Sequence, residues 1–411
     1  MVTSDATKDL CLASLLIHAD DGISSHRAVA PAMHVSTTFR YNDDPDKLVV
    51  QENIDENAPL DSHVYSRLTN SNTTRFEALL ESLLGGQTVA YGSGLSAFHA
   101  MMVHLNPKRI SITEGYHGCH GIIGILNRLN GLQKLPLDCD ESELQAGDVI
   151  HVETPLNPTG EARDLAYYAA KARRVGAYLT VDATFAPPPL QDPLAYDADV
   201  IMHSGTKYFG GHSDMLCGTL TINPKHKDWK PRLIVDRLLL GSVMGSFEGW
   251  LGLRSIRTLE LRLIRQSTTA TAVVEWLAKS VEDVSSAAAA TVERIQHASL
   301  QPEAKDESSW LRKQMPNGWG PVFAIWMKTE DMARKLPSKL GLFQHATSLG
   351  GVESLIEWRA MSDDSIDRRV LRVSIGLEGV EDLKRDFEQA FASLQGEVSE
   401  REVINCTLNK K

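Results

Sequence analysis

Lys207 and Asp182 are two residues of this 411-residue chain whose types and surroundings could do chemistry together. Lys207 lies in the run 202–214, Met-His-Ser-Gly-Thr-Lys-Tyr-Phe-Gly-Gly-His-Ser-Asp, directly after a short apolar segment that predicts a strand. A lysine amine can form a Schiff base with an aldehyde cofactor, and an aspartate can hold the nitrogen of a pyridinium ring. Asp182 ends the apolar run 177–182, and open α/β sheets place ligands at the carboxyl ends of their strands. A lone lysine is usually a solvated charge, but this pairing favours a cofactor site.

Hydroxyl groups and small residues near Lys207 indicate a place for a phosphate. Ser204 and Thr206 flank the lysine, and the run 92–96, Gly-Ser-Gly-Leu-Ser, lies between a predicted strand and a predicted helix. Backbone amides at a helix N-terminus form an anion site, although a plain tight turn is the alternative for these glycines. Tyr65 and Arg67 could add a phenol and a guanidinium, unless Arg67 is an ordinary solvated side chain.

Two further segments offer polar groups. Tyr116 begins the run Tyr-His-Gly-Cys-His, whose imidazoles and thiol could bind zinc, but no second cluster completes a tetrahedral set. We therefore predict no metal, and expect Tyr116 to stack on a flat cofactor ring. Asn157, in the run 153–160, could donate to a ring hydroxyl or form an ordinary Asn-Pro turn.

The composition is that of a globular enzyme with small ligands. The chain is 42% hydrophobic and 23% charged, which excludes global disorder. A net charge of -11 argues against nucleic-acid and anionic-membrane partners, because neither attracts an acidic surface. The five cysteines form no Cys-x-x-Cys pair, the N-terminus lacks a basic leader, and no apolar run reaches the length of a membrane span. We expect a cytoplasmic protein.

Short apolar segments alternate with helical ones between residues 74 and 207, which predicts a mainly parallel sheet covered by helices. The predicted helices and strands there are 74–84, 88–91, 95–104, 109–112, 148–152, 165–176, 177–182 and 199–202. A long helical stretch, 249–279, is followed by strand candidates at 322–326 and 371–375 and a final helix at 380–394. We predict an N-terminal arm over 1–62, a large cofactor-binding domain over 63–265 and a C-terminal domain over 266–411.

The motifs, taken in order, resemble the Cys/Met-metabolism family of pyridoxal phosphate (PLP) enzymes. The likeness extends from about residue 30 to residue 391 and rests on the runs 65–67, 153–160, 181–185, 204–214 and 348–354. That family contains cystathionine γ-synthase, cystathionine lyases, methionine γ-lyase and O-acetylhomoserine sulfhydrylase. The resemblance implies the α/β fold of PLP-dependent transferases of fold type I, like aspartate aminotransferase. It also implies a mainly parallel large domain, a smaller α+β C-terminal domain, and pyridoxal 5'-phosphate as cofactor.

The resemblance also assigns roles to individual residues. Lys207 would form the Schiff base and move protons, Asp182 would pair with the pyridine nitrogen, and Tyr116 would stack on the ring and move protons. The remaining assignments are the phosphate contacts Gly94, Leu95, Ser204 and Thr206; the ring contacts Asn157 and Thr184; the substrate-carboxylate contacts Ser348 and Arg372; and the phosphate contacts from a neighbouring subunit, Tyr65 and Arg67. Such sharing implies a homo-oligomer, either a dimer or a dimer of dimers.

The chain departs from the family pattern at several positions, while the predicted cofactor contacts themselves are kept. His34 replaces a frequent tyrosine, Ala183 replaces an asparagine, His117 replaces a glycine, and Thr347 replaces a glutamate common in γ-acting relatives. Trp358-Arg359 stands where His-Pro is usual. We expect these changes to border the distal end of the substrate or the incoming nucleophile. With Trp358 there, cysteine would be a poor nucleophile.

The chain is similar to fungal γ-synthase-like members, some of which serve secondary metabolism. The favoured function is γ-substitution on an O-activated L-homoserine such as O-acetyl-L-homoserine, with a thiol or a β-keto carbon acid as nucleophile. A cystathionine β- or γ-lyase is the alternative within the family. A nucleotide-binding oxidoreductase using residues 92–94 is the alternative from another class, but the chain lacks the Gly-x-Gly-x-x-Gly pattern there. A non-catalytic scaffold is disfavoured because both Lys207 and Asp182 are present.

Overall fold

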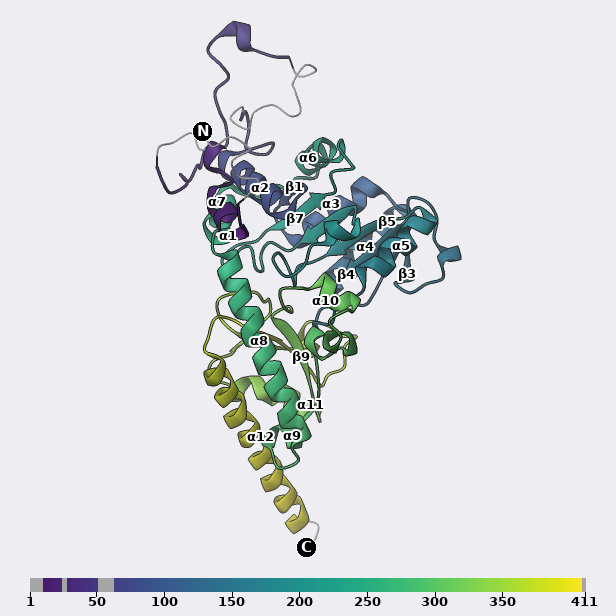
Figure 1. Cartoon of the computed structure of the whole chain (residues 1–411), viewed down its shortest axis with the longest axis vertical. Coiled ribbons are helices and arrows are strands. Elements are labelled where there is room, and N and C mark those ends of the chain that lie inside the picture. Colours follow the sequence, from purple (N-terminus) through teal and green to yellow (C-terminus); the bar gives the residue numbers. More distant parts are fainter. Residues whose placement is uncertain (1–9, 24–27, 51–62, 409–411) are drawn as a thin grey trace. The chain divides into compact units, whose positions relative to one another are not determined.

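The computed structural model describes residues 10–23, 28–50 and 63–408, which form two compact units (Figure 1). Unit 1 comprises Met1–Glu114, Gly118–Glu153 and Leu165–Leu261, and unit 2 comprises Gly115–His117, Thr154–Asp164 and Arg262–Lys411, each as far as it is described. Part of the expected arm over residues 1–62 lies outside the described residues.

Unit 1 is built on a seven-stranded sheet in the order β1-β7-β6-β5-β4-β2-β3. Its strands are β1 (Gln87–Tyr91), β2 (Arg109–Ile112), β3 (Gln133–Pro136), β4 (Val149–Glu153), β5 (Tyr178–Asp182), β6 (Val200–His203) and β7 (Gly218–Ile222). Strand β7 pairs antiparallel with β1 and β6, and the other described pairings are parallel. The predicted mainly parallel sheet is confirmed.

The helices of unit 1 follow the expected alternation with the strands. They are α1 (Leu12–His18), α2 (Ser71–Leu84), α3 (Gly94–Leu105), α4 (His117–Asn130), α5 (Leu165–Val175), α6 (Trp229–Leu240) and α7 (Ser246–Ile256). In α2 the Asn70 side chain accepts from Thr73 N at the start, and Gly85 ends the helix with φ +71°. Glycine adopts this left-handed conformation without a Cβ penalty, which is why the predicted stop is correct.

Side chains alternate between the two faces of the central strands and so separate an apolar face from a polar one. Alternate residues of β4, β5 and β6, including Ile150, Val181 and Ile201, form one buried cluster with α5. Thr180 and Asp182 alternate with these residues along β5 and therefore lie on the opposite face of the sheet. Asp182 therefore leaves the sheet on the face away from the α5 cluster.

Unit 2 has a five-stranded sheet in the order β10-β11-β12-β9-β8. Its strands are β8 (Val292–Gln296), β9 (Val322–Met327), β10 (Gln344–His345), β11 (Leu355–Trp358) and β12 (Val370–Ser374). Its helices are α9 (Ala287–Thr291), α10 (Trp310–Gln314), α11 (Glu330–Lys335) and α12 (Val380–Leu408), with α8 (Leu259–Glu282) entering from unit 1. The helical stretch expected at 249–279 is two helices, because a turn at Thr258, bonded to Ser255 O, separates α7 from α8.

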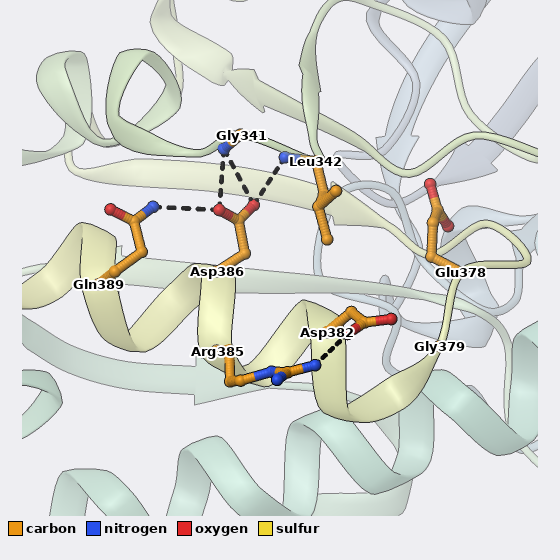
Figure 2. Close-up of a pocket in the computed structure, with 8 residues that line it drawn as sticks. All are labelled: Gly341, Leu342, Glu378, Gly379, Asp382, Arg385, Asp386 and Gln389. Atoms are coloured by element: carbon orange, nitrogen blue, oxygen red, sulfur yellow. Dashed lines mark hydrogen bonds and ion pairs between the residues drawn. The ribbon is translucent and has the colours of Figure 1, made fainter.

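The core of unit 2 lies between its sheet and the helices α8 and α12. Val273, Phe323, Val373 and Phe387 are among its fully buried members. Figure 2 shows how α12 also holds a loop: Asp386 accepts from the backbone amides of Gly341 and Leu342. The surface pocket drawn there contains none of the predicted site residues. No helix in the described part of the chain is both long and apolar enough to cross a membrane.

Candidate active site

The carboxyl ends of β1, β5 and β6 meet at one edge of the unit 1 sheet, and the predicted cofactor residues follow them. Gly94 comes after β1, Asp182 ends β5, and the run 204–207 comes after β6. These strands run in the same direction, because β1 and β6 both pair antiparallel with β7 between them. The fold therefore brings these segments to the same sheet edge.

Asp182 is buried and electrostatically linked to Lys207. Thr184 N donates to its Oδ1 at 2.9 Å. Burial raises the pKa of Asp182, while hydrogen bonds from Thr184 and the charge of Lys207 act in the opposite direction. A buried carboxylate of this kind gains most from a cation placed beside it, which is what a protonated ring nitrogen provides.

Thr184 connects Asp182 to the segment that precedes Lys207. Its hydroxyl oxygen accepts from Ser204 N at 2.8 Å while its own amide donates to Asp182. Lys207 is half-buried, and its amide donates to Ser204 O at 3.1 Å. The three predicted contacts of the ring and the Schiff base are therefore held by one short chain of hydrogen bonds.

The start of α3 packs directly against Ser204. A Cβ on Gly94 would lie 3.1 Å from Ser204 Cβ, and one on Gly218 would lie 2.1 Å from Ser93 O. Gly218 is thus needed for the close approach of β7 to Ser93 O, and a side chain at Gly94 would crowd Ser204. Ser93 caps the helix by accepting from Ser96 N. The amides of Gly94 and Leu95, in the first turn, have no acceptor within the helix and suit a phosphate.

Thr206 is engaged differently from the other predicted phosphate contacts. Its hydroxyl donates to Cys217 O at 3.2 Å and accepts from Cys217 N at 2.9 Å. A phosphate needs a donor, so this hydroxyl would have to turn away from Cys217 O to bind one. Gly94, Leu95 and Ser204 are the better-supported phosphate contacts.

Tyr65 and Arg67 lie together on the surface of unit 1. Both are exposed, and the Arg67 guanidinium carbon is 5.2 Å from the centre of the Tyr65 ring. Among the described residues, no side-chain hydrogen bond or ion pair joins either one to Asp182, Ser204 or Lys207 within the same chain. Within one chain, the structure therefore does not bring these two residues into the Lys207 group.

In unit 2 the predicted substrate contacts Ser348 and Arg372 lie together with Asn157, a predicted ring contact. Arg372 Nη2 donates to Ser348 O at 2.9 Å, and Nη1 donates to Asn157 Oδ1 at 3.2 Å. Ser348 has φ +77°, an uncommon conformation for a residue with a side chain. The backbone turn there directs the carbonyl of Ser348 to the guanidinium. Asn157 is thus bonded to a predicted carboxylate-binding arginine in addition to its predicted ring contact.

Glu357 is a member of this group that sequence reasoning missed. It is paired with Arg372 across β11 and β12, and its Oε2 lies 2.6 Å from Arg372 Nη2. Burial opposes ionisation of Glu357 most strongly. The charges of Arg372 and Arg359, with hydrogen bonds from Ser362 and Arg359, nevertheless lower the pKa of this carboxyl. Successive side chains of β11 face opposite sides of the sheet, so Glu357 lies on the face opposite to the core residue Ile356. This alternation is the sequence signal that could have identified Glu357.

Tyr116 belongs to unit 2, just before the start of α4, with its ring centre 4.9 Å from that of His117. Cys119, in unit 1, is buried, and its thiol pKa is raised by burial and then by the charges of Asp182 and Glu153. Glu153, on β4, is in register with Asp182 and was also missed. No group of three or more His, Cys, Asp or Glu side chains within residues 10–23, 28–50 and 63–408 could hold a metal ion.

The expected role of Trp358 in a substrate pocket is wrong. Its indole packs against the core of unit 2, and its Nε1 donates to Arg368 O at 2.7 Å. Successive residues of a strand face opposite sides, so Trp358 points away from the face that carries Glu357 and Arg372. Trp358 therefore gives no reason to expect that cysteine is a poor nucleophile. Thr347 is exposed, and the His34 backbone is tied to Asn72 and Ser246.

The residues of unit 1 fit pyridoxal 5'-phosphate. The group needs a carboxylate for its ring nitrogen, an amine for its aldehyde and donors for its phosphate. Asp182, Lys207 and the first-turn amides of α3 supply these, and the approach of Gly94 to Ser204 leaves a backbone cradle that a Cβ would crowd. The chemistry of the donor set thus agrees with the predicted cofactor.

Known proteins are similar to this chain over most of its length. Residues 13–392 match the family described as Cys/Met metabolism PLP-dependent enzyme. A cystathionine beta-lyase of Lactococcus lactis subsp. cremoris is 32% identical over 346 residues, covering 79% of this chain and 87% of the lyase. A cystathionine gamma-synthase of Escherichia coli is 32% identical over 385 residues, covering 88% of this chain and 93% of the synthase.

A solved structure gives the same result for the fold. The cystathionine gamma synthase of Xanthomonas oryzae pv. oryzae, in complex with aminoacrylate and cysteine, superposes with a TM-score of 0.81 at 25% identity. The superposition covers 95% of this chain and 99% of the synthase chain. The fold is therefore that of the type I PLP enzymes, and the oxidoreductase alternative is set aside. The chain belongs to the Cys/Met-metabolism family of PLP-dependent enzymes, and its cofactor is pyridoxal 5'-phosphate.

Proposed function

We propose that the enzyme catalyses γ-substitution on an O-activated L-homoserine such as O-acetyl-L-homoserine, with a thiol or a β-keto carbon acid as nucleophile. The observation that carries the amino-acid chemistry is the buried Asp182, electrostatically linked to Lys207 at the edge of a parallel sheet. The similarity to a γ-synthase over 385 residues supports the substitution reaction.

Lys207 is the proton carrier of the proposed reaction. When bound, the cofactor holds the substrate amine through its aldehyde carbon and draws electrons from Cα, which makes the Cα proton acidic. The Lys207 amine removes that proton, and a Cβ proton leaves next. The leaving group then departs from Cγ with its electron pair, and the nucleophile adds to Cγ of the unsaturated chain. Protons returned to Cβ and Cα complete the substitution.

Asp182 supplies the fixed charge that this chemistry requires. Its carboxylate would hold a proton on the ring nitrogen of the bound cofactor and so favour electron withdrawal from Cα. Thr184 keeps the carboxylate in place through its amide. The amides of Gly94 and Leu95, with the Ser204 hydroxyl, hold the phosphate, and Tyr116 stacks on the ring and passes protons.

Arg372 binds the carboxylate of the substrate amino acid. A guanidinium presents parallel N–H groups that match the two oxygens of a carboxylate. Ser348 O fixes the orientation of the Arg372 guanidinium through the 2.9 Å contact with Nη2. The contact between Arg372 and the substrate carboxylate restricts the substrate to α-amino acids with a free carboxylate.

The direct test is product analysis. The PLP-loaded enzyme is incubated with O-acetyl-L-homoserine and, separately, with cysteine, simple thiols and β-keto acids, and products are identified by mass. We expect a product that joins the nucleophile to Cγ, and none from the Lys207→Ala variant. Formation of only 2-oxobutanoate and ammonia with every nucleophile would contradict substitution.

A cystathionine lyase is the second candidate, favoured by the 32% identity to the Lactococcus β-lyase. The same enzyme preparation is therefore given cystathionine. Release of homocysteine with pyruvate indicates β-elimination, and release of cysteine with 2-oxobutanoate indicates γ-elimination. A kcat/KM for cystathionine well above that for acetylhomoserine with any nucleophile would replace the substitution by a lyase reaction.

We also propose that the active site is shared between two copies of the chain, in a dimer or a dimer of dimers. The exposure of Tyr65 and Arg67, stacked on each other, supports contacts made to another subunit. Mixed oligomers of Lys207→Ala and Arg67→Ala subunits should regain part of the wild-type activity, because one kind of hybrid site is intact. Verified mixed oligomers without recovered activity would indicate that each site is built within one chain.

A further inference from the structure

Arg359 is a buried arginine of unit 2 that the proposed reaction does not yet use. Only 2% of its side chain is exposed, and its Nε has no hydrogen-bond partner among the described residues. Its Nη1 donates to Glu357 Oε2 at 3.0 Å, and its Nη2 lies 3.7 Å from an oxygen of Asp363. Arg359 belongs to the pair Trp358-Arg359, one of the departures from the family resemblance noted above.

Glu357 Oε2 is shared by two guanidinium groups. It lies 2.6 Å from Arg372 Nη2 and 3.0 Å from Arg359 Nη1, and all three side chains are at least 95% buried. Ser362 Oγ donates to the other oxygen, Oε1, at 2.8 Å. A single buried carboxylate is thus compensated by two cations and a hydroxyl.

The substrate carboxylate and Glu357 need the same guanidinium. Each terminal nitrogen of arginine carries two N–H groups. Those of Arg372 Nη2 are directed to Glu357 and to Ser348 O, and one on Nη1 is directed to Asn157. A two-pronged contact with a substrate carboxylate therefore requires Arg372 to give up part of its contact with Glu357 or Ser348.

Releasing Glu357 from Arg372 would be expensive if Arg372 were its only cation, because an uncompensated buried carboxylate is strongly disfavoured. Arg359 removes most of that penalty, since it remains 3.0 Å from the same oxygen. We propose that Arg359 is a positioning residue that holds Glu357 so that Arg372 can turn to the substrate carboxylate. This inference rests on the proposed function of Arg372 and extends it to a residue outside the family pattern.

The network continues toward the segment before α4. Burial acts most strongly to raise the pKa of Asp363, but hydrogen bonds from Ser365 and then the charges of Arg359 and His117 lower it overall. His117 is another departure from the family pattern and is adjacent to Tyr116. Two positions far apart in the sequence, 117 and 359, thus act on the same carboxylate.

The test measures equilibrium binding rather than turnover. The PLP-loaded enzyme is titrated by calorimetry with L-2-aminobutyrate, which has no leaving group, and with its carboxamide. Arg359→Met should weaken binding of the acid by about tenfold and leave binding of the amide within about twofold. The double variant Glu357→Gln/Arg359→Met should recover the acid affinity to within about threefold, because the competing charge is gone. Arg359→Lys keeps a cation and should lie between wild type and Arg359→Met.

Two controls separate the possible failures. Arg334→Met removes an exposed arginine of unit 2 and should leave both affinities unchanged. Arg372→Lys should remove most of the preference for acid over amide; if it does not, the proposed role of Arg372 is wrong. If Arg372→Lys removes the preference but Arg359→Met and Arg359→Lys leave it intact, only the role of Arg359 is wrong. Equal weakening of acid and amide by Arg359→Met, or no recovery in the double variant, also overturns that role.

Discussion

The site residues of unit 1 and those of unit 2 are held in different ways. In unit 1, Asp182 ends a parallel strand, the run 204–207 follows another, and backbone amides hold the key groups. In unit 2, Glu357 and Arg372 lie opposite each other within antiparallel strands, and each compensates the charge of the other. The first arrangement depends on where strands end, and the second on which strands pair.

This difference predicts different consequences of substitution. Lys207 is only half-buried in the segment that follows β6, so its loss should affect mainly the reaction. A charged side chain within a buried strand pair contributes to both binding and stability, because its loss leaves the partner charge uncompensated. The predictions below separate these consequences, from the largest expected effect to the smallest.

Replacing Lys207 should have the largest effect on the reaction and little effect on stability. Lys207→Ala removes the amine that we propose moves protons, so kcat should fall by at least about 10³-fold. The unfolding free energy of the cofactor-free protein should change by less than about 1 kcal/mol, because Lys207 is half-buried in the segment after β6 and Asp182, whose pKa is raised by burial, can take up a proton when the lysine charge is lost. Steady-state kinetics and denaturant unfolding measure the two quantities. Lys227→Ala, at an exposed lysine, is the control, and retained turnover in Lys207→Ala would remove Lys207 from the reaction.

Replacing Arg372 should affect both quantities. Arg372→Met leaves Glu357 with Arg359 as its remaining guanidinium, so we expect a loss of about 2 kcal/mol of stability and about a 100-fold loss in kcat/KM. Most of the kinetic change should be an increase in KM, because a binding contact is lost. Denaturant unfolding of the cofactor-free protein isolates the stability term. A loss of activity with unchanged stability would show that the two units do not differ in this respect.

The buried histidines provide a matched comparison of the two units in acid. Burial lowers the pKa of His203, in unit 1, to about 3 and that of His297, in unit 2, to about 4. Both folded-state values lie below the ordinary value near 6.5, so the unfolded chain binds the proton first. The stability contributed by each neutral histidine is complete above about pH 6.5 and declines as the pH falls toward the folded-state pKa.

His203 and His297 differ in their partners. His203 has no hydrogen-bond partner among the described residues, whereas His297 Nε2 is 2.7 Å from Gly320 O. His203→Leu should therefore stabilise the protein at pH 5 relative to pH 8 by about 2 kcal/mol. His297→Leu should destabilise it at pH 8, because a buried carbonyl loses its donor. Melting temperatures at both pH values test this, with the exposed His345→Gln as control. An unchanged pH dependence in His203→Leu would contradict the buried neutral state.

The smallest expected effect concerns the backbone at Ser348. Its φ of +77° is accessible to glycine at little cost, so Ser348→Gly should be more stable than Ser348→Ala by about 1 kcal/mol. Both variants lack the hydroxyl, and the comparison therefore isolates the backbone conformation. Chemical denaturation measures the difference. Equal stabilities would mean that the turn that directs the Ser348 carbonyl to Arg372 is not strained.

Much of unit 1 could be predicted from the sequence because its signals are local. The apolar runs before Asp182 and Lys207 predicted β5 and β6, and the Gly85 stop predicted the end of α2. Helix α4 was not among the predicted elements, because its first residues, His-Gly-Cys-His-Gly, include poor helix formers. Strand β7 was missed because Gly-Thr-Leu-Thr-Ile has no continuous apolar run, and its antiparallel direction has no local signal.

The sequence by itself determined the prediction that Lys207 and Asp182 bind the cofactor, because the chemistry proposed for each depends on its own side chain and on the strand just before it. Only the tertiary structure decided that Arg372 shares Glu357 with Arg359 and that Trp358 faces the core. Those contacts depend on the register between β11 and β12 and on which face of β11 is buried. Register is a property of two segments packed together, so neither segment carries it alone.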